Sequence, residues 1–230
     1  MKRVISFSIY GNDKKYTVGL LRNLELSPKI YPWWIVYIYY NNSVPIEMIN
    51  EYSKFENVKM ICMDEYNIPG VFWRFFPNDD VERFISRDTD SRLSMREKNA
   101  VDEWIESGKS LHIMRDHPHH EIPIHAGLFG VKIDPSLNIE KEALKWLSNL
   151  NMNGLYQKTS DHPFLKKIIY DKYLDNGDMI CHDSYFTHHP FSKPFPTKME
   201  DYRFIGEIYD ENENRYYQYT EWIGKKEIRD

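Results

Sequence analysis

Segments that suit β-strands alternate with segments that suit helices in the first part of the chain, and this alternation constrains the fold more than any other feature. The strand segments are rich in β-branched and aromatic residues, whereas the helical segments carry apolar residues at helical spacing. Strand–helix–strand units in series form right-handed crossovers and build a mostly parallel sheet. The predicted order is strand Val4–Tyr10, helix Tyr16–Leu26, strand Trp33–Tyr40, helix Ile46–Phe55 and strand Val58–Met63.

The rest of the chain continues this pattern without a linker. Neither a Gly/Ser-rich nor a Pro-rich stretch divides the 230 residues, so the sequence predicts a single domain over residues 1–230. The predicted class is α/β, with a Rossmann-like, mostly parallel central sheet flanked by helices. The further predicted elements are the strands Val81–Arg87, Leu111–Met114 and Met179–Cys181 and the helices Ser94–Glu106, Ile139–Leu150 and Pro163–Tyr173.

Two acidic residues, Asp88 and Asp90, follow the predicted strand Val81–Arg87. Because side chains alternate along extended backbone, carboxylates two residues apart leave a strand end on nearly the same side. Ser94 and Glu97 match an S-x-x-E capping box, so a helix is expected soon after the acidic pair. This order is typical of the carboxyl edge of an open α/β sheet, where ligands bind. Two carboxylates favour Mg²⁺ or Mn²⁺ kept open to phosphate, and such a cation would bridge a diphosphate.

Composition narrows the expected partners and location. The chain has 30 Lys and Arg against 35 Asp and Glu, so we expect no general attraction to nucleic acid or to an anionic membrane. We also expect no membrane span, because no uninterrupted apolar run is long enough. Cys62 and Cys181 do not form a C-x-x-C motif, which fits a reducing compartment and predicts a cytoplasmic location.

Six segments share a more specific pattern. They are FSIYG at residues 7–11, VFWRFFP at 71–77, FISRDTDSRLSMREKNAVDEW at 84–104, LHIMRDHPHHEIPIHAGLFG at 111–130, SDHPFL at 160–165 and CHDSYF at 181–186. Together they resemble a family of small GT-A-fold glycosyltransferases found in large DNA viruses and bacteria. His162 departs from the family pattern, which usually has Gln at this position.

The resemblance implies an activity and its partners. It implies a hexosyl- or deoxyhexosyltransferase that takes a sugar from a nucleotide diphosphate-sugar, with UDP-sugar favoured, and passes it to a hydroxyl of a glycan acceptor. It also implies that a nucleotide-sugar-binding half covers about residues 1–115 and an acceptor-binding half about residues 116–230. If the protein is viral, the expected location becomes the host cytoplasm.

The expected cofactor is Mn²⁺ or Mg²⁺, held by Asp88, Asp90 and His182. Asp90 is the first choice for direct coordination. Asp88 is expected to bind the cation directly, through water, or through the ribose hydroxyls. His182 resembles a late histidine that completes the metal shell in such enzymes, although a histidine buried in the core remains the alternative.

The donor is expected to contact the loop after the first strand and several arginines. Gly11 allows close backbone approach and Tyr10 offers a stacking ring, so Ser8, Tyr10 and Gly11 are assigned to the nucleoside end. Guanidinium groups bind phosphates or carboxylates in bidentate fashion, so each arginine either contacts the diphosphate or forms a structural ion pair. The residues assigned to the diphosphate end are Arg74, Arg87, Asp88 and Thr89, with Arg92 and Arg115 as further candidates.

Three carboxylates are candidates for a general base or a ligand of the acceptor hydroxyl. Asp116 and Asp161 come first, Asp183 is third, and Arg115 completes the candidate catalytic group. An inverting enzyme needs such a base, whereas a retaining enzyme does not, and the sequence leaves both open. Four histidines between the predicted fifth strand and residue 125 show no zinc-site spacing, so they are expected to surround an acceptor pocket. They are His117, His119, His120 and His125.

Two other functional classes remain open. Phosphatases of the haloacid dehalogenase type also place D-x-D after a strand, with the first Asp as nucleophile, but there the motif normally ends the first strand. Here it follows the fourth predicted strand. A non-catalytic carbohydrate-binding module is the other alternative, because the 15% aromatic content would also serve sugar binding.

Overall fold

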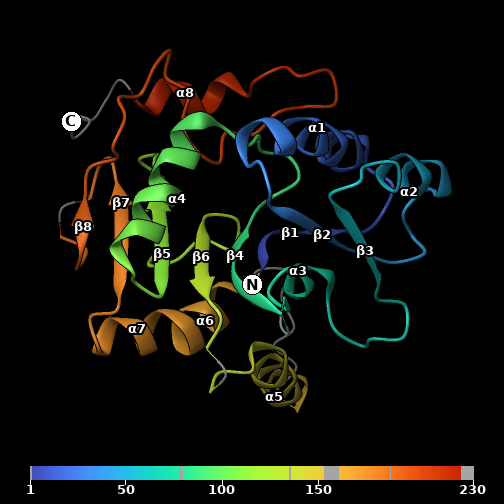
Figure 1. The fold of residues 1–230 in the computed structure, drawn as a ribbon, viewed down its shortest axis with the longest axis horizontal. Helices are drawn as coiled ribbons and strands as arrows, with labels where there is room; N and C mark the ends of the chain where they lie inside the picture. The colour runs from blue at the N-terminus through green and yellow to red at the C-terminus, as the bar shows by residue number, and fades with distance from the viewer. Residues whose placement is uncertain (1, 78–79, 135, 153–160, 187, 224–230) are drawn as a thin grey trace.

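An eight-stranded sheet forms the centre of the protein (Figure 1), and its strands lie in the order β3-β2-β1-β4-β6-β5-β7-β8. The computed structural model describes residues 2–77, 80–134, 136–152, 161–186 and 188–223. The strands are β1 Lys2–Ile9, β2 Ile35–Tyr40, β3 Val58–Cys62, β4 Val81–Ser86, β5 Leu111–Arg115, β6 Phe129–Lys132, β7 Met179–Asp183 and β8 Ser192–Lys193.

The sheet is mostly parallel. Strands β3, β2, β1 and β4 pair in parallel, and so do β5, β7 and β8. Strand β6 alone among the described strands runs antiparallel, between β4 and β5. The fold class predicted from the sequence, a single α/β domain with a mostly parallel sheet between helices, is confirmed.

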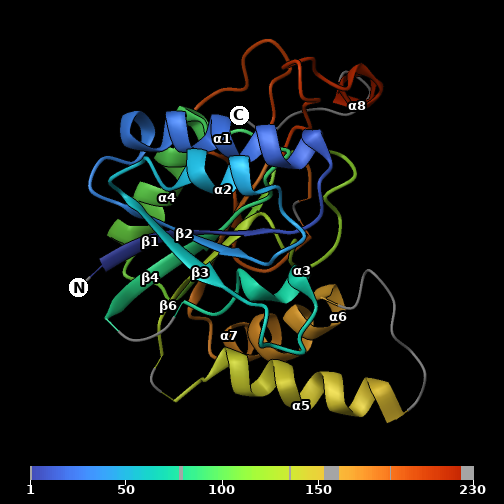
Figure 2. The ribbon, with the colours of Figure 1, turned by 90° about the vertical axis from the view of Figure 1, so that its right-hand side faces the viewer.

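Helices cover both faces of the sheet, as Figure 2 shows. Helices α1, α2 and α4 lie on one face, and α3, α5, α6 and α7 on the other. None of the helices described is both long and apolar enough to cross a membrane. The helices are α1 Lys14–Ile30, α2 Ile46–Tyr52, α3 Gly70–Trp73, α4 Met95–Ser107, α5 Ile139–Met152, α6 Asp161–Leu165, the π-helical turn η1 Lys166–Tyr170, α7 Asp171–Asp175 and α8 Tyr217–Ile223.

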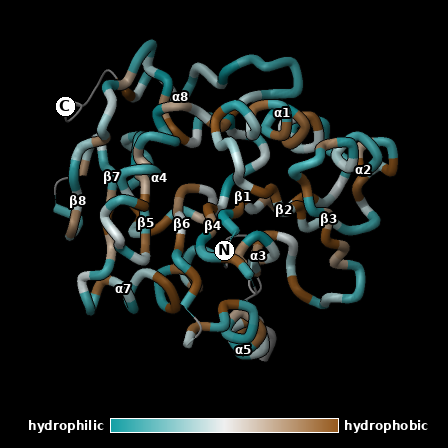
Figure 3. The backbone as a smooth tube through the Cα atoms, in the orientation of Figure 1, coloured by the Kyte–Doolittle hydropathy of each residue, from teal (hydrophilic) through white to brown (hydrophobic). Residues whose placement is uncertain are grey.

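Neighbouring residues of a strand pack into two different hydrophobic cores, one on each face of the sheet. In β1, Val4 packs under the α3–α5 face and Ile5 under the α1–α4 face, and Phe84 and Ile85 divide in the same way in β4. This follows from the period-two alternation of side chains in a strand. The central strands therefore bury apolar side chains on both faces, and brown segments mark the apolar residues of the central sheet in Figure 3.

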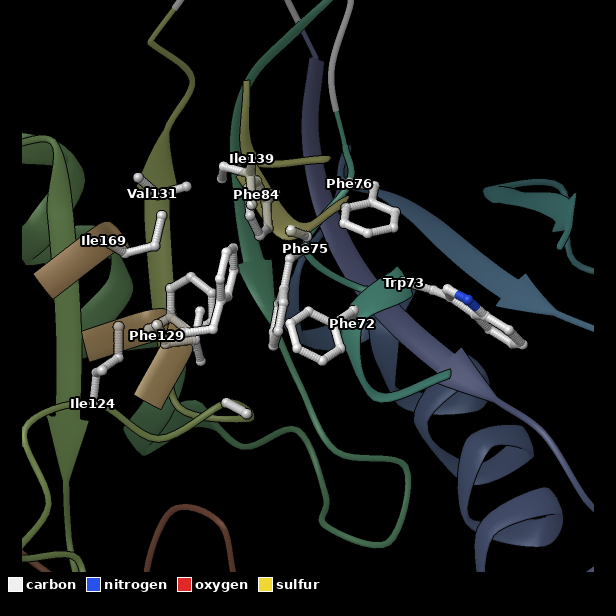
Figure 4. Close-up of a cluster of buried hydrophobic side chains, with 14 of the residues drawn as sticks. Phe72, Trp73, Phe75, Phe76, Phe84, Ile124, Phe129, Val131, Ile139 and Ile169 are labelled. Atoms are coloured by element: carbon white, nitrogen blue, oxygen red, sulfur yellow. The ribbon is translucent and has the colours of Figure 1, made fainter. Parts of the chain in front are cut away.

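Aromatic rings form much of the core on the α3–α5 face of the sheet. Phe72 and Phe75 of the α3 region lie 6.1 Å apart between ring centroids, and Phe75 lies 5.6 Å from Phe129. Phe129 in turn meets Phe84 of β4 at 6.0 Å (Figure 4). These tilted and edge-to-face contacts are the preferred aromatic geometries. They fix α3, and with it the neighbouring Arg74, against the sheet.

A buried ion pair joins β4 to α4. Arg87 Nε lies 2.8 Å from Glu97 Oε1, and the Tyr31 hydroxyl donates to the same oxygen at 2.7 Å. The predicted N-cap is confirmed, since Ser94 Oγ accepts from the Glu97 backbone N–H at 3.2 Å. Among the described contacts, however, the Glu97 carboxylate binds Arg87 and not the N-cap, so only half of the predicted capping box is present.

A buried histidine makes stability depend on pH. His112 stacks on Trp104, with ring centroids 5.4 Å apart, and its Nε2 lies 2.8 Å from His182 Nδ1. Burial, followed by the nearby His182, holds the pKa of His112 well below its ordinary 6.5. The folded chain thus keeps this ring neutral at pH values where the unfolded chain protonates it, so the unfolded state binds more protons. The free energy of unfolding should fall as pH drops below 6.5.

Urea unfolding above and below pH 6.5 tests this linkage. The difference in unfolding free energy between the two pH values should be smaller in His112→Leu than in the wild type. The exposed His188 provides the control variant His188→Gln, which should keep the wild-type difference. An identical pH difference in His112→Leu and wild type would contradict the assignment.

Candidate active site at the carboxyl edge of the sheet

A cleft of about 720 Å³ opens where β1 and β4 end. Its walls come from the loop after β1, the acidic turn after β4, the segment before β6, the start of α6 and a C-terminal strap, residues 206–215, of which Gly206 and Ile208 line the cleft. Ligands of open α/β sheets bind at this edge. The sequence-predicted residues that line the cleft are Ser8, Tyr10, Gly11, Arg74, Asp88, Thr89, Asp90, His120, His125 and Asp161.

Asp88 is held by Arg74. Arg74 Nη1 forms a short ion pair with Asp88 Oδ1, and its Nη2 lies 3.6 Å from Asp161 Oδ2. Desolvation acts to raise the pKa of Asp88, but the Arg74 guanidinium outweighs it and holds that pKa below its ordinary value. Ser8 fixes the backbone of Arg74, because Ser8 Oγ accepts from the Arg74 N–H at 2.9 Å. One buried cation therefore positions two carboxylates in the cleft.

Asp90 is held by a lysine that the sequence analysis did not single out. Lys15 Nζ, in the first turn of α1, lies 2.7 Å from Asp90 Oδ2. Burial and the nearby Asp88 carboxylate raise the pKa of Asp90, although Lys15 acts in the opposite direction. The Asp90 carbonyl oxygen also accepts from the Tyr209 N–H at 2.9 Å, which ties the acidic turn to the C-terminal strap.

A second pocket, of about 570 Å³, shares Tyr10 with the cleft. It lies at the ends of β1, β2 and β3, where polar and aromatic side chains such as Asn41, Asp64 and Tyr66 line it. Gly11 has a φ of 77°, the left-handed region that favours glycine, and its N–H donates to Ser43 Oγ at 2.7 Å. The predicted first loop thus connects the two pockets.

Two arginines assigned to the site lie in the core instead. Arg87 is buried against Glu97, and it does not line either pocket. Arg115 is fully buried, 3.3 Å from Asp183 Oδ2, with its Nε donating to the Ile122 carbonyl at 3.0 Å. The structure therefore corrects both assignments, because each guanidinium is already used to hold neighbouring segments together. Asp183 is fully buried in the same network.

Asp116 is also a structural residue. Its carboxylate accepts a bidentate pair of hydrogen bonds from Arg96 at 2.8 and 2.7 Å, and others from the Ser184 hydroxyl and the Ile205 N–H. It is fully buried and does not line the cleft. Because its oxygens are saturated by donors, the predicted role of Asp116 as a general base is not supported. Asp161 is the one candidate base that the structure brings to the cleft.

His182 is separated from the acidic pair. Its Nδ1 lies 2.8 Å from His112 Nε2, and its Nε2 lies 3.0 Å from Glu103 Oε2. Both ring nitrogens are thus engaged, Nδ1 with β5 and Nε2 with α4, and the buried ring does not line the cleft. The prediction that His182 is the third metal ligand is therefore wrong. The alternative, a histidine buried in the core, is the observed arrangement.

The predicted histidine cluster divides into two groups. His120 and His125 line the cleft with ring centroids 4.8 Å apart, and His162 lies 5.8 Å from His125. His117 and His119 instead pack near α8, where His117 Nε2 lies 2.8 Å from the Tyr219 carbonyl oxygen. Burial and the nearby His162 lower the pKa of His125 to about 4, so this imidazole is neutral at physiological pH.

The remaining sequence-predicted arginine lies at the rim. Arg92 pairs with Glu213 of the C-terminal strap at 2.7 Å, and its guanidinium stacks over the Tyr209 ring. It does not line the cleft. It therefore holds the strap next to the acidic turn.

The acidic pair fits a divalent cation that is bound together with a diphosphate. Among the residues that the structure describes, no three His, Cys, Asp or Glu side chains converge on one point. Two carboxylates do face the cleft, and Mg²⁺ or Mn²⁺ commonly takes one or two carboxylates plus phosphate and water. The two carboxylates are hard oxygen ligands, but they are too few to complete the coordination shell of such a cation. A phosphate ligand could supply further oxygens.

Gly127 makes room for the Asp88 carboxylate. A Cβ built on Gly127 would overlap Asp88 Oδ2, and it would lie 3.1 Å from the Asp88 backbone nitrogen. Gly127→Ala should therefore displace the carboxylate from the cleft and weaken Mn²⁺-dependent nucleotide binding by about tenfold, measured by calorimetry. Only a residue without a side chain allows this approach.

Gly108→Ala is the matched control for this substitution. Gly108 ends α4 with a φ of 72° and has nothing within 4 Å of its built Cβ, so alanine there strains the backbone without touching the cleft. The control should lose about 1 kcal/mol of stability and keep nucleotide affinity. Equal nucleotide affinity in Gly127→Ala and wild type would show that the Asp88 position is unimportant.

Comparisons with known proteins identify the fold. No protein-family model matches the chain, and no curated protein matches it either. An active-site mutant of the galactosyltransferase LgtC superposes with a TM-score of 0.50 at 11% identity, covering 98% of this chain and 96% of that one. A glycosyltransferase involved in glycosylation of the major capsid of PBCV-1 gives 0.45 at 14% identity, covering 80% and 82%. The 4-diphosphocytidyl-2C-methyl-D-erythritol synthase of Anaerococcus prevotii gives 0.48 at 9% identity, covering 78% and 86%.

The fold is the Rossmann-like GT-A fold. It is shared with the LgtC mutant over nearly the whole of both chains.

Proposed function

We propose that the protein is a metal-dependent glycosyltransferase that moves a sugar from a nucleotide diphosphate-sugar, with a UDP-sugar favoured, to a hydroxyl of a glycan acceptor. The observation that carries this proposal is that Asp88 and Asp90 both line a cleft that shares the side chain of Tyr10 with a second pocket. The two neighbouring pockets offer separate places for a nucleoside and for a diphosphate with its sugar.

The smaller pocket suits the nucleoside. Tyr10 is 41% exposed and Tyr66 48% exposed, so both rings have a free surface on which a base can stack. Tyr10 is supported from behind by an edge-to-face contact with Trp73, with centroids 5.8 Å apart. Asn41 and Asp64 supply polar groups that can bond the edge of a base or the ribose.

The acidic turn suits the diphosphate. Asp88 and Asp90 would hold Mn²⁺ or Mg²⁺, which when bound neutralises the negative charge that develops on the departing diphosphate. Arg74 holds Asp88 in place, and its buried guanidinium adds positive charge to the cleft wall. Thr89 lines the cleft between the two acids.

The sugar and acceptor hydroxyls would face Asp161 and His125. Asp161 lines the cleft at the start of α6, where its carboxylate lies 3.6 Å from Arg74 Nη2. His125 is neutral at physiological pH because its pKa is lowered to about 4, and its buried Nε2 has no hydrogen-bond partner among the described residues. Both groups can therefore accept or share a hydrogen bond with a hydroxyl, and they come from the half assigned to the acceptor.

The two other functional classes are less well supported. A haloacid dehalogenase-type phosphatase would need one acid of the pair as a free nucleophile at the end of its first strand. Here the pair follows β4, and both acids are engaged by cations of the chain. A carbohydrate-binding module would not require two acids in the same cleft.

A thermal-shift screen with UDP-, GDP- and dTDP-sugars, each with and without Mn²⁺, tests the function. A ligand that binds the folded state raises the melting temperature. We expect the largest rise with a UDP-sugar and Mn²⁺ together, accompanied by slow release of UDP. Absence of any rise with all three donor classes would contradict the proposal, and binding without turnover would favour the binding module.

A further inference from the structure

The Lys15 ammonium contacts the Asp90 carboxylate, to which a metal ion would also bind. Its Nζ lies 2.7 Å from Asp90 Oδ2, and the two side chains are 21% and 13% exposed. The same ammonium lies 4.9 Å from the Tyr16 ring centroid and 5.5 Å from that of Tyr216. The lysine is therefore held at the rim of the cleft between two aromatic rings, with Asp90 as its anionic partner.

The stability of α1 does not account for this lysine. The helix begins after Asp13, whose side chain accepts from the Lys15 N–H at 2.9 Å, and its first turn contains no acidic residue. A cation in the first turn is unfavourable, because the positive end of the helix dipole lies there. The Lys15 side chain instead finds its compensating charge in Asp90, on a distant segment of the chain.

The two cations at the acidic pair differ in their freedom to move. The Arg74 side chain is 11% exposed, its backbone N–H is bonded to Ser8, and its guanidinium contacts both Asp88 and Asp161. Lys15 has a flexible four-carbon stem and one described carboxylate partner. Lys15 can therefore leave its carboxylate by rotation about side-chain bonds, whereas Arg74 cannot.

The net charge of the cluster determines whether a divalent cation can bind there alone. Three carboxylates, those of Asp88, Asp90 and Asp161, are opposed by the two cations Arg74 and Lys15, so the cluster carries only one net negative charge. A divalent cation added alone would leave an excess of positive charge in a partly buried site, which is unfavourable. A diphosphate arriving with the cation removes that excess.

We propose that Lys15 is an exchangeable counter-ion that competes with the divalent cation for Asp90 and then binds the donor diphosphate. This inference rests on the proposed function and assigns the coupling between metal and nucleotide to one residue. Without the metal, Lys15 offsets the charge of Asp90, and it thereby disfavours binding of the metal alone. When metal and nucleotide bind together, the displaced ammonium moves to the phosphate oxygens.

Direct titration of Mn²⁺ into the protein without nucleotide tests the competition, with free Mn²⁺ followed by electron paramagnetic resonance. Lys15→Met keeps the length of the side chain but removes its charge, so it should bind Mn²⁺ about tenfold more tightly than the wild type. Lys15→Arg keeps the charge and should resemble the wild type. Circular dichroism should give the same helical signal for all three proteins.

Calorimetric titration of UDP at saturating Mn²⁺ tests the second half of the proposal. Lys15→Met should bind UDP about tenfold more weakly than the wild type, because one charge-assisted contact is lost. The substitution is thus expected to change the two affinities in opposite directions. A lysine that served only the fold would lower both or neither.

The outcomes separate this inference from the proposed function. Unchanged or weaker binding of Mn²⁺ alone in Lys15→Met overturns the counter-ion role, even where UDP still binds with Mn²⁺. Tighter binding of Mn²⁺ in Lys15→Met, with no binding of UDP to any variant, supports the competition but overturns both the diphosphate contact and the proposed donor. Absence of Mn²⁺ binding in wild type and both variants overturns the inference together with the metal site.

Discussion

Asp90→Asn should lower Mn²⁺-dependent turnover of the nucleotide-sugar by about a hundredfold or more, with little change in fold. Asparagine keeps the size of the side chain and its hydrogen bonds, but it removes the negative charge that binds a divalent cation. Asp90 faces the cleft, and its backbone is anchored through the Tyr209 N–H, so the substitution should not move the turn. Release of UDP from the donor, measured at saturating Mn²⁺, is the direct readout.

Asp102→Asn is the matched control for Asp90→Asn. Asp102 lies in α4, pairs with Lys98 on an exposed helix surface and does not line the cleft. Its replacement should leave turnover close to the wild-type value. The metal assignment fails if Asp90→Asn retains wild-type turnover and the same dependence on Mn²⁺.

Glu97→Ala should have the largest effect on stability. It leaves Arg87 without its partner, and both side chains of this ion pair are 2% exposed. Removing one member of a buried ion pair typically costs about 3–5 kcal/mol, because the other charge stays buried without compensation. The Tyr31 hydroxyl would lose its acceptor as well. Urea unfolding of the variant and the wild type measures the difference.

The double variant Arg87→Met/Glu97→Leu separates the buried charge from the packing. With both charges replaced by apolar side chains, much of the lost stability should return, since such exchanges are often close to neutral. A loss below about 1 kcal/mol in Glu97→Ala would mean that Arg87 is solvated and not the buried residue described here.

The N-terminal half of the fold could be predicted from the sequence because its signals are local. The runs that form β1, β2 and β3 are apolar and bounded by turns, and the predicted strands and observed ones differ only at their ends. The predicted second strand begins too early, since Trp33 has a φ of 71° and is 97% exposed. Strand β6 was not predicted, because four residues with a glycine give no periodic signal.

The acidic pair could be predicted to line the cleft because it follows β4 closely, at the carboxyl edge of the sheet where ligands bind. Asp88 and Asp90 both line the cleft, whereas Arg87, one residue before Asp88, enters the core. Residues 87–90 lie beyond β4, where strand alternation no longer applies and Thr89 lines the cleft as well, so only the position of the pair was available from the sequence. The partners of Asp116 and His182 were not, because Arg96 and Glu103 come from distant segments whose positions only the fold determines.

Lys15 and Gly127 illustrate what local patterns omit. Lys15 lies 75 positions before Asp90 in the sequence and is brought to it by the parallel pairing of β1 with β4. Gly127 approaches Asp88 through the turn that leads into antiparallel β6. Both contacts depend on strand order, which a sequence of short strands does not specify.

Calorimetric titration of UDP into the wild-type protein, with Mn²⁺ and then with an excess of a chelator, shows whether a metal links the acidic pair to the diphosphate. One UDP should bind per chain in the presence of Mn²⁺, and binding after chelation should be at least about a hundredfold weaker. Equal affinity with and without the metal, or no binding under either condition, would contradict the assignment of Asp88 and Asp90 to a metal-bridged diphosphate.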